Sequence, residues 1–231
     1  MLETAYLRIR GAAKERITRP PENSSRHYLE EWAREAASVG TSKDFRVLDV
    51  GAGSAPYRSL FAHVSYETAD LAQTKKQYGE LDHVCDATDM PIADDTFDLV
   101  FCSQTLEHIS EPVKALTEMR RVLKPGGEAW LSAPLFYAEH EVPYDYYRYT
   151  KYAWRYMAEQ AGFRVKDISW LEGYFGTVSY QLNMAAKSLP VDRPTRALLH
   201  VLARRFARRD IEQKVIRKGM CKNYRVTLVK R

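Results

Sequence analysis

Two stretches of the chain carry side chains that suit proton transfer and substrate recognition. Residues 103–108 end in a glutamate and a histidine, and residues 136–150 hold five tyrosines, a histidine and an arginine. Imidazole titrates near neutral pH, so His140 is the first candidate for a general base and His108 the second. Aromatic faces can stack on a sugar or a planar ring while polar tips orient hydroxyl groups. The predicted substrate contacts are Tyr137, Tyr144 and Arg148.

Structural roles compete with these assignments. Ion pairs among Glu141, Asp145 and Arg148 could simply tie the second stretch to a sheet. In the same way, His108 could cap the start of a helix instead of acting as a base. The sequence leaves both alternatives open.

A histidine next to a glutamate also raises the question of a metal ion. Glu107 precedes His108, and His140 precedes Glu141. Adjacent residues do not project together from a regular element, and the sequence offers no evident third ligand. Metal dependence is therefore not expected, and the predicted site contains no metal ligand.

Residues 45–54, F-R-V-L-D-V-G-A-G-S, form a short apolar run that ends in an acid and two spaced glycines. The pattern predicts a buried strand that turns sharply into a helix, where Gly51 and Gly53 let the backbone approach a ligand closely. A dinucleotide site needs a third glycine, whereas this chain has Pro56, which supplies no N–H to a pyrophosphate. A nicotinamide or flavin cofactor is therefore disfavoured.

A second acid lies where the next strand is predicted to end. Asp70 follows S-Y-E-T-A and comes 17 residues after Gly53. A carboxylate at this strand tip can accept both hydroxyl groups of a ribose. A solvated loop aspartate is the alternative, and the register with the glycines favours the ribose role.

The motif V-L-D-V-G-A-G resembles the first motif of class I S-adenosylmethionine-dependent methyltransferases. The segments F-D-L-V, L-E-H and R-V-L-K-P-G-G are similar to the type 11-like branch, which includes many small-molecule enzymes. The resemblance covers about residues 46–134. It implies S-adenosylmethionine as the cofactor, bound across the tips of the first three strands.

The same resemblance implies roles for individual residues. Asp86 would accept from the adenine amino group while the next backbone N–H, that of Ala87, bonds the ring. Asp49 would support the turn and the amino-acid end of the cofactor. The predicted cofactor contacts are Asp49, Gly51, Ala52, Gly53, Asp70, Leu71, Asp86, Ala87, Ser103 and Gln104.

The predicted fold is α/β, a doubly wound, seven-stranded, mostly parallel sheet of the Rossmann-like methyltransferase type. A near-continuous apolar run at 97–102 predicts a strand buried on both faces, and the run at 81–89 predicts the third strand. Residues 1–40 are expected to form an arm and a helix whose Trp32 either packs on the sheet or lids the cofactor pocket. Residues 171–221 are expected to form a helical insertion before the last strand.

Composition indicates one domain, residues 1–231, in a reducing compartment. The chain has 231 residues, 45% of them hydrophobic, which is enough for one α/β domain with a large core. Its three cysteines show no Cys-x-x-Cys spacing. The N-terminus lacks a signal-peptide core, and the longest uncharged run is too short to span a bilayer. A cytoplasmic protein is therefore expected.

Charge is unevenly distributed along the chain. Residues 1–192 hold 22 basic and 28 acidic side chains, whereas residues 193–231 hold 13 and 2. Residues 195–209 have the pattern of a basic amphipathic helix. This helix either packs on its own domain or on a second copy in a homodimer, or it docks on an anionic membrane that carries a lipid-linked acceptor.

These patterns predict an S-adenosylmethionine-dependent methyltransferase that methylates a hydroxyl on a small molecule, a glycan or a lipid-linked metabolite. Base methylation of nucleic acid is disfavoured, because S-Q-T-L follows the fourth strand in place of an Asn/Asp-Pro-Pro-aromatic motif. The alternatives are a cofactor-binding regulatory module without activity and, less favoured, a nicotinamide-dependent oxidoreductase or an RNA methyltransferase.

Overall fold

The computed structural model describes residues 24–73, 78–216 and 219–231. The chain divides into two compact units. The larger unit holds Tyr28–Leu171 and Met220–Arg231; of the described residues, the smaller unit holds 24–27 and those of Glu172–Gly219. The expectation of a single domain therefore stays a prediction. Residues 1–23, where the N-terminal arm is predicted, lie outside the described residues.

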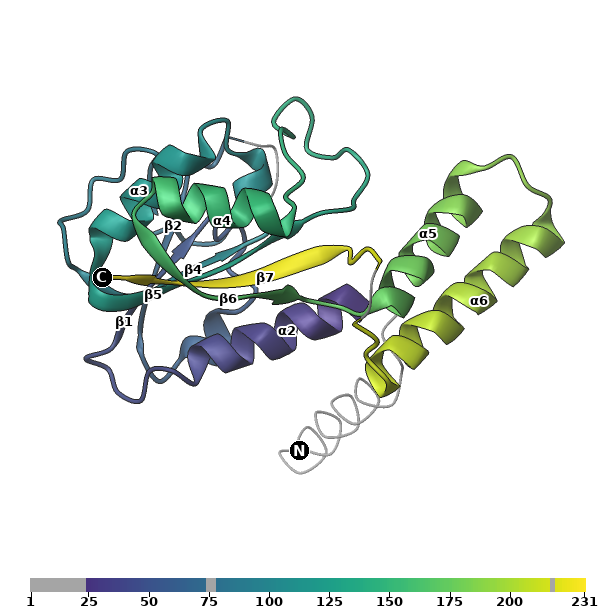
Figure 1. Cartoon of the computed structure of the whole chain (residues 1–231), viewed down its shortest axis with the longest axis horizontal. Coiled ribbons are helices and arrows are strands. Elements are labelled where there is room, and N and C mark those ends of the chain that lie inside the picture. The colour runs from purple at the N-terminus through teal and green to yellow at the C-terminus, as the bar shows by residue number, and fades with distance from the viewer. Residues whose placement is uncertain (1–23, 74–77, 217–218) are drawn as a thin grey trace, which may run out of the picture. The chain divides into compact units, whose positions relative to one another are not determined.

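The larger unit is built on a seven-stranded sheet with the order β3-β2-β1-β4-β5-β7-β6 (Figure 1). Strands β1 to β5 pair in parallel, and β7 runs antiparallel to β5 and β6. This confirms the predicted fold class. The strands are β1 (Arg46–Val50), β2 (Ser65–Asp70), β3 (His83–Val84), β4 (Phe97–Ser103), β5 (Leu123–Pro134), β6 (Phe163–Trp170) and β7 (Asn223–Lys230).

Helices cover both faces of this sheet (Figure 1). Helices α3 (Pro112–Val122) and α4 (Lys151–Gln160) pack on one face, and the part of α2 (Ser24–Ala37) that follows His27 packs on the other. Trp32 of α2 is only 1% exposed, and its ring lies 4.7 Å from that of Phe101, centroid to centroid. The packing role predicted for Trp32 is therefore confirmed.

Strand β4 is the centre of the core. Its residues from Leu99 to Cys102 are at most 1% exposed, as a strand covered by helices on both faces requires. The two short 3-10 helices η1 (Arg58–Phe61) and η2 (Leu106–His108) follow β1 and β4. Helix η2 places the sequence L-E-H directly beyond the carboxyl end of β4.

The third strand is much shorter than the predicted run at 81–89. Strand β3 pairs with β2 over two residues only. The carboxylate of Asp82 accepts hydrogen bonds from the backbone N–H and the hydroxyl of Thr68, at 2.9 and 2.8 Å, where strand pairing would otherwise continue. Asp86 consequently lies beyond the strand and not at its last paired position.

The glycine turn after β1 connects the tips of two strands. The N–H of Gly51 donates to the carbonyl of Ala69 in β2 at 2.8 Å. Gly51 has a φ of +73°, and a Cβ there would lie 2.1 Å from the side chain of Thr105. Only glycine satisfies both constraints, so the predicted sharp turn is confirmed.

The smaller unit is a helical hairpin of α5 (Tyr174–Ser188) and α6 (Arg193–Glu212). The helices approach each other closely because Ala203 and Ala207 of α6 are small and fully buried. The rings of Phe175 and Phe206 add a contact at 5.7 Å between centroids. The predicted helical insertion is confirmed. Among the described residues, no helix is both long enough and apolar enough to cross a bilayer.

Candidate functional site

A cavity of about 250 Å³ lies at the edge of the sheet where the parallel strands end. Strand tips β1, β2 and β4, the segment after β3, helix η2 and the loop after β5 all contribute to its walls. This is the edge at which open α/β sheets bind ligands. The predicted site residues that line it are Gly51, Gly53, Asp70, Leu71, Asp86, Ala87, Gln104, His108 and Tyr144.

Asp70 fixes the geometry of the turn at one end of this cavity. One carboxylate oxygen accepts the N–H of Gly53 and the other accepts the N–H of Ala72, both at 2.9 Å. Each oxygen has a second lone pair, so the carboxylate can accept further hydrogen bonds from a ligand. The predicted role of Asp70 toward ribose hydroxyls stays a prediction, and the position of the side chain is consistent with it.

Asp86 also lines the cavity, but one of its oxygens is already engaged. Its Oδ1 accepts the backbone N–H and the hydroxyl of Thr88, at 2.8 and 2.9 Å. This turn presents the backbone of Ala87 to the cavity as well. The arrangement leaves the predicted adenine contacts geometrically accessible.

Three predicted cofactor residues do not line the cavity: Asp49, Ala52 and Ser103. Asp49 is 3% exposed and accepts a short hydrogen bond from the hydroxyl of Tyr66. Burial raises the pKa of the Asp49 carboxyl to about 7, against the lowering effect of the Tyr66 hydrogen bond. Asp49 therefore lies within the core, and its predicted roles toward the turn and the cofactor stay predictions.

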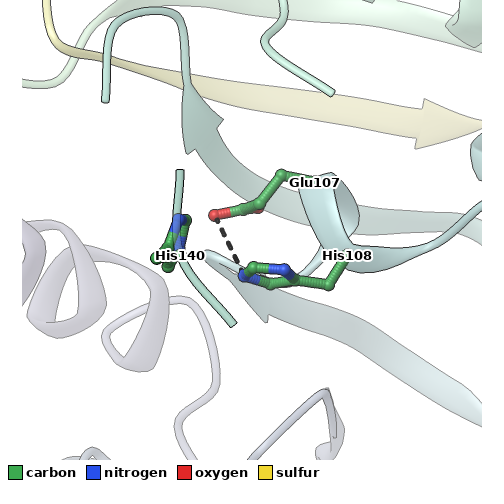
Figure 2. Close-up of side chains that lie close together, drawn as sticks. All are labelled: Glu107, His108 and His140. Carbon is green, nitrogen blue, oxygen red and sulfur yellow. Dashed lines mark ion pairs between the residues drawn. The ribbon is translucent and has the colours of Figure 1, made fainter. Parts of the chain in front are cut away.

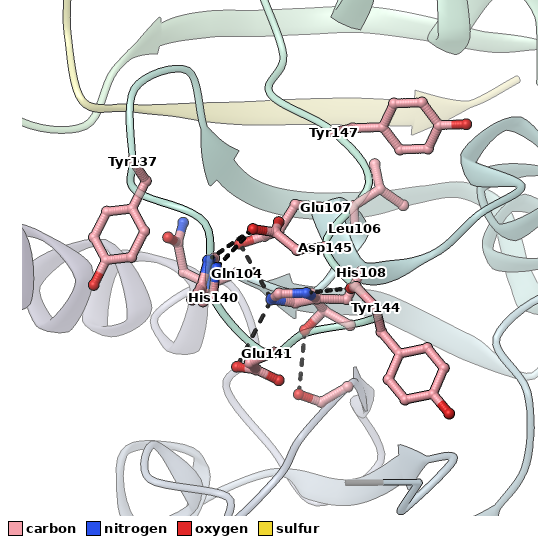
Figure 3. Close-up of polar contacts among 12 residues, drawn as sticks. Gln104, Leu106, Glu107, His108, Tyr137, His140, Glu141, Tyr144, Asp145 and Tyr147 are labelled. Carbon is pink, nitrogen blue, oxygen red and sulfur yellow. Dashed lines mark hydrogen bonds and ion pairs between the residues drawn. The ribbon is translucent and has the colours of Figure 1, made fainter.

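His108 lies at the other end of the cavity and has a fixed orientation (Figure 3). Its Nδ1 is 2.7 Å from the carbonyl oxygen of Tyr144. A carbonyl only accepts, so Nδ1 carries a proton and Nε2 of the neutral ring is the acceptor. Nε2 lies 3.7 Å from a carboxylate oxygen of Glu141 and 4.0 Å from one of Glu107.

His140 does not line the cavity but stands beside His108. The two imidazole centroids are 4.7 Å apart and the rings meet edge to face. The Nδ1 of His140 lies 3.2 Å from the carbonyl oxygen of Ala138 and 3.4 Å from the carboxylate of Asp145. Burial, followed by the neighbouring His108, lowers the pKa of His140.

Arg148 and Asp145 give the loop after β5 its shape. Arg148 bonds both carboxylate oxygens of Asp145, at 2.6 and 2.8 Å, and donates to the carbonyls of Tyr137 and Ala138, each at 3.1 Å. This pairing holds the pKa of Asp145 well below its usual range. The ion-pair alternative is thus present for Asp145 and Arg148. Neither Arg148 nor Tyr137 lines the cavity.

Glu107 is the functional candidate that sequence reasoning set aside. Its side chain is fully buried, and neither carboxylate oxygen has a hydrogen-bond partner. Burial raises the pKa of Glu107 to about 8. One ligand atom from each of Glu107, His108 and His140 lies within 4.8 Å of the others (Figure 2).

The sequence showed no evident third ligand, but the fold brings His140 beside Glu107 and His108, and the absence of a metal stays a prediction. The physical reason is a set of long-range backbone contacts. The N–H groups of Tyr146 and Tyr147 donate to the carbonyl of Glu107 at 2.9 and 3.2 Å, and the Tyr149 hydroxyl donates to the carbonyl of Leu106 at 2.8 Å. These bonds fold the loop back onto η2, so His140 becomes the third candidate ligand.

Two cavity residues that are not glycine have left-handed backbone conformations. Gln104 has a φ of +56° and Glu141 a φ of +53°. Such conformations cost about 1–3 kcal/mol each and cluster at functional sites. Among the cavity residues that the sequence did not indicate are Thr105 and Glu141. No sequence signal pointed to Thr105, and the sequence suggested Glu141 as an ion-pair partner and as a neighbour of His140, not as a cavity residue.

Comparison with known sequences and structures agrees with this geometry. Residues 48–131 match a family described as a methyltransferase domain, type 11. The demethylmenaquinone methyltransferase of Renibacterium salmoninarum is 40% identical over 110 residues, which cover 43% of this chain and 46% of the relative. The ubiquinone/menaquinone biosynthesis C-methyltransferase UbiE of Haemophilus ducreyi is 32% identical over 117 residues, covering 42% and 45%. The chain thus spans less than half the length of these relatives.

A solved structure shares the fold. The phosphoethanolamine N-methyltransferase 2 of Haemonchus contortus, in complex with S-adenosyl-L-methionine, matches with a TM-score of 0.53 at 15% identity. The match covers 83% of this chain and 50% of that chain. At this identity the likeness concerns the fold alone. The likeness to the type 11 methyltransferase domain family is carried by the central segment of the chain, residues 48–131.

Proposed function

We propose that this protein is a methyltransferase that uses S-adenosylmethionine to methylate a hydroxyl oxygen of a small molecule, a glycan or a lipid-linked metabolite. The observation that carries the proposal is the continuous cavity at the strand tips. It has glycines and carboxylates at one end and His108 with Tyr144 at the other. One wall therefore suits the cofactor and the opposite wall suits an acceptor.

The first wall fits the adenosyl part of the cofactor. A Cβ at Gly53 would meet no atom within 4 Å, so no side chain covers the backbone of this cavity residue and a ligand can approach it closely. Asp70 and Asp86 supply carboxylates for hydroxyl and amino donors. When bound, the cofactor supplies a methyl group on a sulfonium, and the sulfur keeps the bonding electrons on transfer.

The second wall fits an acceptor that loses a proton. A hydroxyl oxygen that forms a bond to the methyl carbon must give up its hydrogen, and a side chain at the cavity wall has to accept it. The side chains of His108 and Glu141 both line this wall, with Nε2 of His108 3.7 Å from a carboxylate oxygen of Glu141. Tyr144 and Tyr146 bring aromatic faces to the same place, where a ring or sugar can stack.

Carbon methylation is the second candidate. It is favoured by one observation, the names of the relatives, one of which is a C-methyltransferase. Both reactions need the same cofactor wall and a proton acceptor. They differ in which atom of the acceptor the cavity presents to the methyl group.

Transfer from S-adenosylmethionine with a ¹³C-labelled methyl group tests the proposal. The protein is incubated with quinols, phenols, sugars and lipid-linked sugars, and the products are analysed by ¹³C NMR, which separates oxygen-bound from carbon-bound methyl groups. Label on oxygen supports the proposal, and label on carbon supports the second candidate. Binding of the cofactor without transfer to any acceptor would contradict both.

We also propose that α6 docks on an anionic membrane where a lipid-linked acceptor resides. Among the described residues, its arginines form no ion pair, and Leu198 and Val201 are 57% and 53% exposed. Basic side chains near exposed apolar ones attract anionic lipid surfaces, at about 1 kcal/mol per charge. The exposed arginines are Arg193, Arg196, Arg204, Arg205, Arg208 and Arg209.

Co-sedimentation with liposomes tests this docking. Vesicles of phosphatidylcholine with phosphatidylserine should retain the wild-type chain at low salt, and pure phosphatidylcholine vesicles should not. Arg204→Glu with Arg208→Glu should weaken retention about tenfold or more. Arg164→Glu, an exposed arginine of β6, is the matched control and should leave retention unchanged. Retention that is independent of anionic lipid would refute the docking.

A further inference from the structure

The geometry points to a binding site for a divalent transition-metal ion of the zinc class, formed by Glu107, His108 and His140. The site stands at the acceptor end of the cavity. Binding of the ion depends only on these side chains, whereas its role in methyl transfer rests on the function proposed above.

The first ligand, His108, is oriented as metal-binding histidines are. Its Nδ1 proton is held by the carbonyl of Tyr144 at 2.7 Å, which fixes the ring and turns Nε2 inward. Nε2 is buried and has no hydrogen-bond partner. Carboxylate oxygens of Glu107 and Glu141 surround it at 4.0 and 3.7 Å. A cation at this point would be held by the imidazole and by the neighbouring carboxylates together.

The second ligand, His140, shows the same arrangement on another segment. Its Nδ1 faces the carbonyl of Ala138 at 3.2 Å and the carboxylate of Asp145 at 3.4 Å, both of which only accept. The proton is therefore held at Nδ1, and Nε2 carries the lone pair. A carboxylate or carbonyl behind a ligating imidazole fixes its tautomer and raises its basicity.

The third ligand, Glu107, supplies the charge. Its side chain is completely buried, and both carboxylate oxygens lack a hydrogen-bond partner. A buried carboxylate without a partner is costly, and a coordinated cation removes that cost.

The distances allow the site to close with a small movement. The three ligand atoms lie within 4.8 Å of one another. Tetrahedral zinc with bonds of about 2.0–2.1 Å separates its ligand atoms by roughly 3.4 Å. Glu107 and His108 are fixed on η2, while the His140 side chain is 29% exposed and lies on a loop. Rotation of the His140 ring, together with a smaller rotation of the Glu107 carboxylate, which lies 4.0 Å from Nε2 of His108, would complete the set; each ligand atom would move by about 1.5 Å or less.

Two imidazoles and one carboxylate form the ligand set of catalytic zinc sites that keep an open fourth position. Because His108 lines the cavity, the open position faces the acceptor. An acceptor hydroxyl that coordinates there has a lowered pKa and loses its proton more readily. The proton passes to the Glu141 carboxylate, and the oxygen forms its bond to the methyl carbon as the carbon–sulfur bond breaks.

Titration of the metal-free protein with zinc chloride tests the site. The full chain is treated with EDTA, dialysed, and titrated with Zn²⁺ by calorimetry and with Co²⁺ by visible absorption. One ion per chain should bind, and bound Co²⁺ should show the intense absorption bands of a tetrahedral site. Glu107→Gln and His140→Ala should each weaken binding about 100-fold or more, the upper end of what loss of a supporting group costs.

His200→Ala is the matched control. It removes an imidazole of α6 that is hydrogen-bonded to Asn183 of α5, and it should leave the affinity for Zn²⁺ unchanged. Equal Zn²⁺ affinity of wild type and both ligand variants, or no binding at all, would overturn the site. Calorimetry with S-adenosylmethionine separates this result from the function. Cofactor binding without Zn²⁺ binding overturns the metal site alone, and Zn²⁺ binding without cofactor binding overturns the proposed function alone.

Discussion

Replacement of Asp49 by asparagine should remove a pH dependence of stability that the wild type shows. Asp49 is buried, and its pKa rises from the ordinary 3.8 to about 7 because burial disfavours the charged form. Between these values the folded state holds a proton that the unfolded state has released. Stability therefore falls as the pH rises through this window, and the contribution is complete only below about pH 4.

The size of the effect follows from proton linkage. Each pH unit over which the two states differ by one proton changes the free energy of unfolding by about 1.4 kcal/mol. The full shift from 3.8 to about 7 corresponds to about 4 kcal/mol. Between about pH 5 and about pH 8 the wild type should lose roughly 2.5 kcal/mol through this group. An asparagine stays neutral, and its side-chain oxygen can still accept the Tyr66 hydroxyl.

Urea denaturation at both pH values measures the prediction. The unfolding free energy of Asp49→Asn minus that of the wild type is measured at each pH. This difference should be roughly 2.5 kcal/mol more favourable to the variant at about pH 8 than at about pH 5. Comparing differences cancels any constant cost of the amide. Asp44→Asn, on an exposed loop residue, is the control and should follow the wild type. A difference that does not change with pH would refute the burial argument.

Four further substitutions test other parts of the account. Gly53→Ala should fold with an unfolding free energy lower by about 1–2 kcal/mol, because residue 53 has a φ of +55°. In calorimetry this variant should bind S-adenosylmethionine more weakly than the wild type. Gly51→Ala should lower the unfolding free energy measured in urea by more than Gly53→Ala does, because its Cβ would lie 2.1 Å from the side chain of Thr105. Asp145→Asn should lower the unfolding free energy by about 1–3 kcal/mol at pH 7, and this cost should decrease as the pH falls below about 4 in urea titrations, because the unfolded wild type then takes up a proton that the folded carboxyl, with its lowered pKa, does not. Trp32→Ala should lower the unfolding free energy by about 3–5 kcal/mol in the same assay.

The cofactor end of the cavity was largely predictable because it depends on local sequence. Two glycines after an apolar run fix a turn, and the strand that follows must end near it. Asp70 therefore falls at the strand tip as expected, where it accepts the N–H of Gly53. Asp49 does not line the cavity as predicted. Successive side chains of a strand point to opposite faces, and that of Asp49 points into the core toward Tyr66.

The acceptor end could not be predicted in the same way because it depends on contacts far apart in the sequence. Glu107 and His140 meet only because the loop after β5 folds back and bonds the carbonyl of Glu107 through two backbone N–H groups. Backbone bonds of this kind leave no mark on residue type. The short third strand has a related cause, since a side chain, Asp82, replaces the strand pairing that its neighbours would allow.

Calorimetric titration with S-adenosylmethionine tests the central claim most directly. The wild type should bind one molecule per chain, and Asp70→Asn should bind at least tenfold more weakly, because a hydrogen bond to a charged group contributes about 1.5–3 kcal/mol. Thermal unfolding establishes that the variant is folded. No binding by the wild type, or equal affinity of a folded Asp70→Asn variant, would contradict the account of the cofactor site.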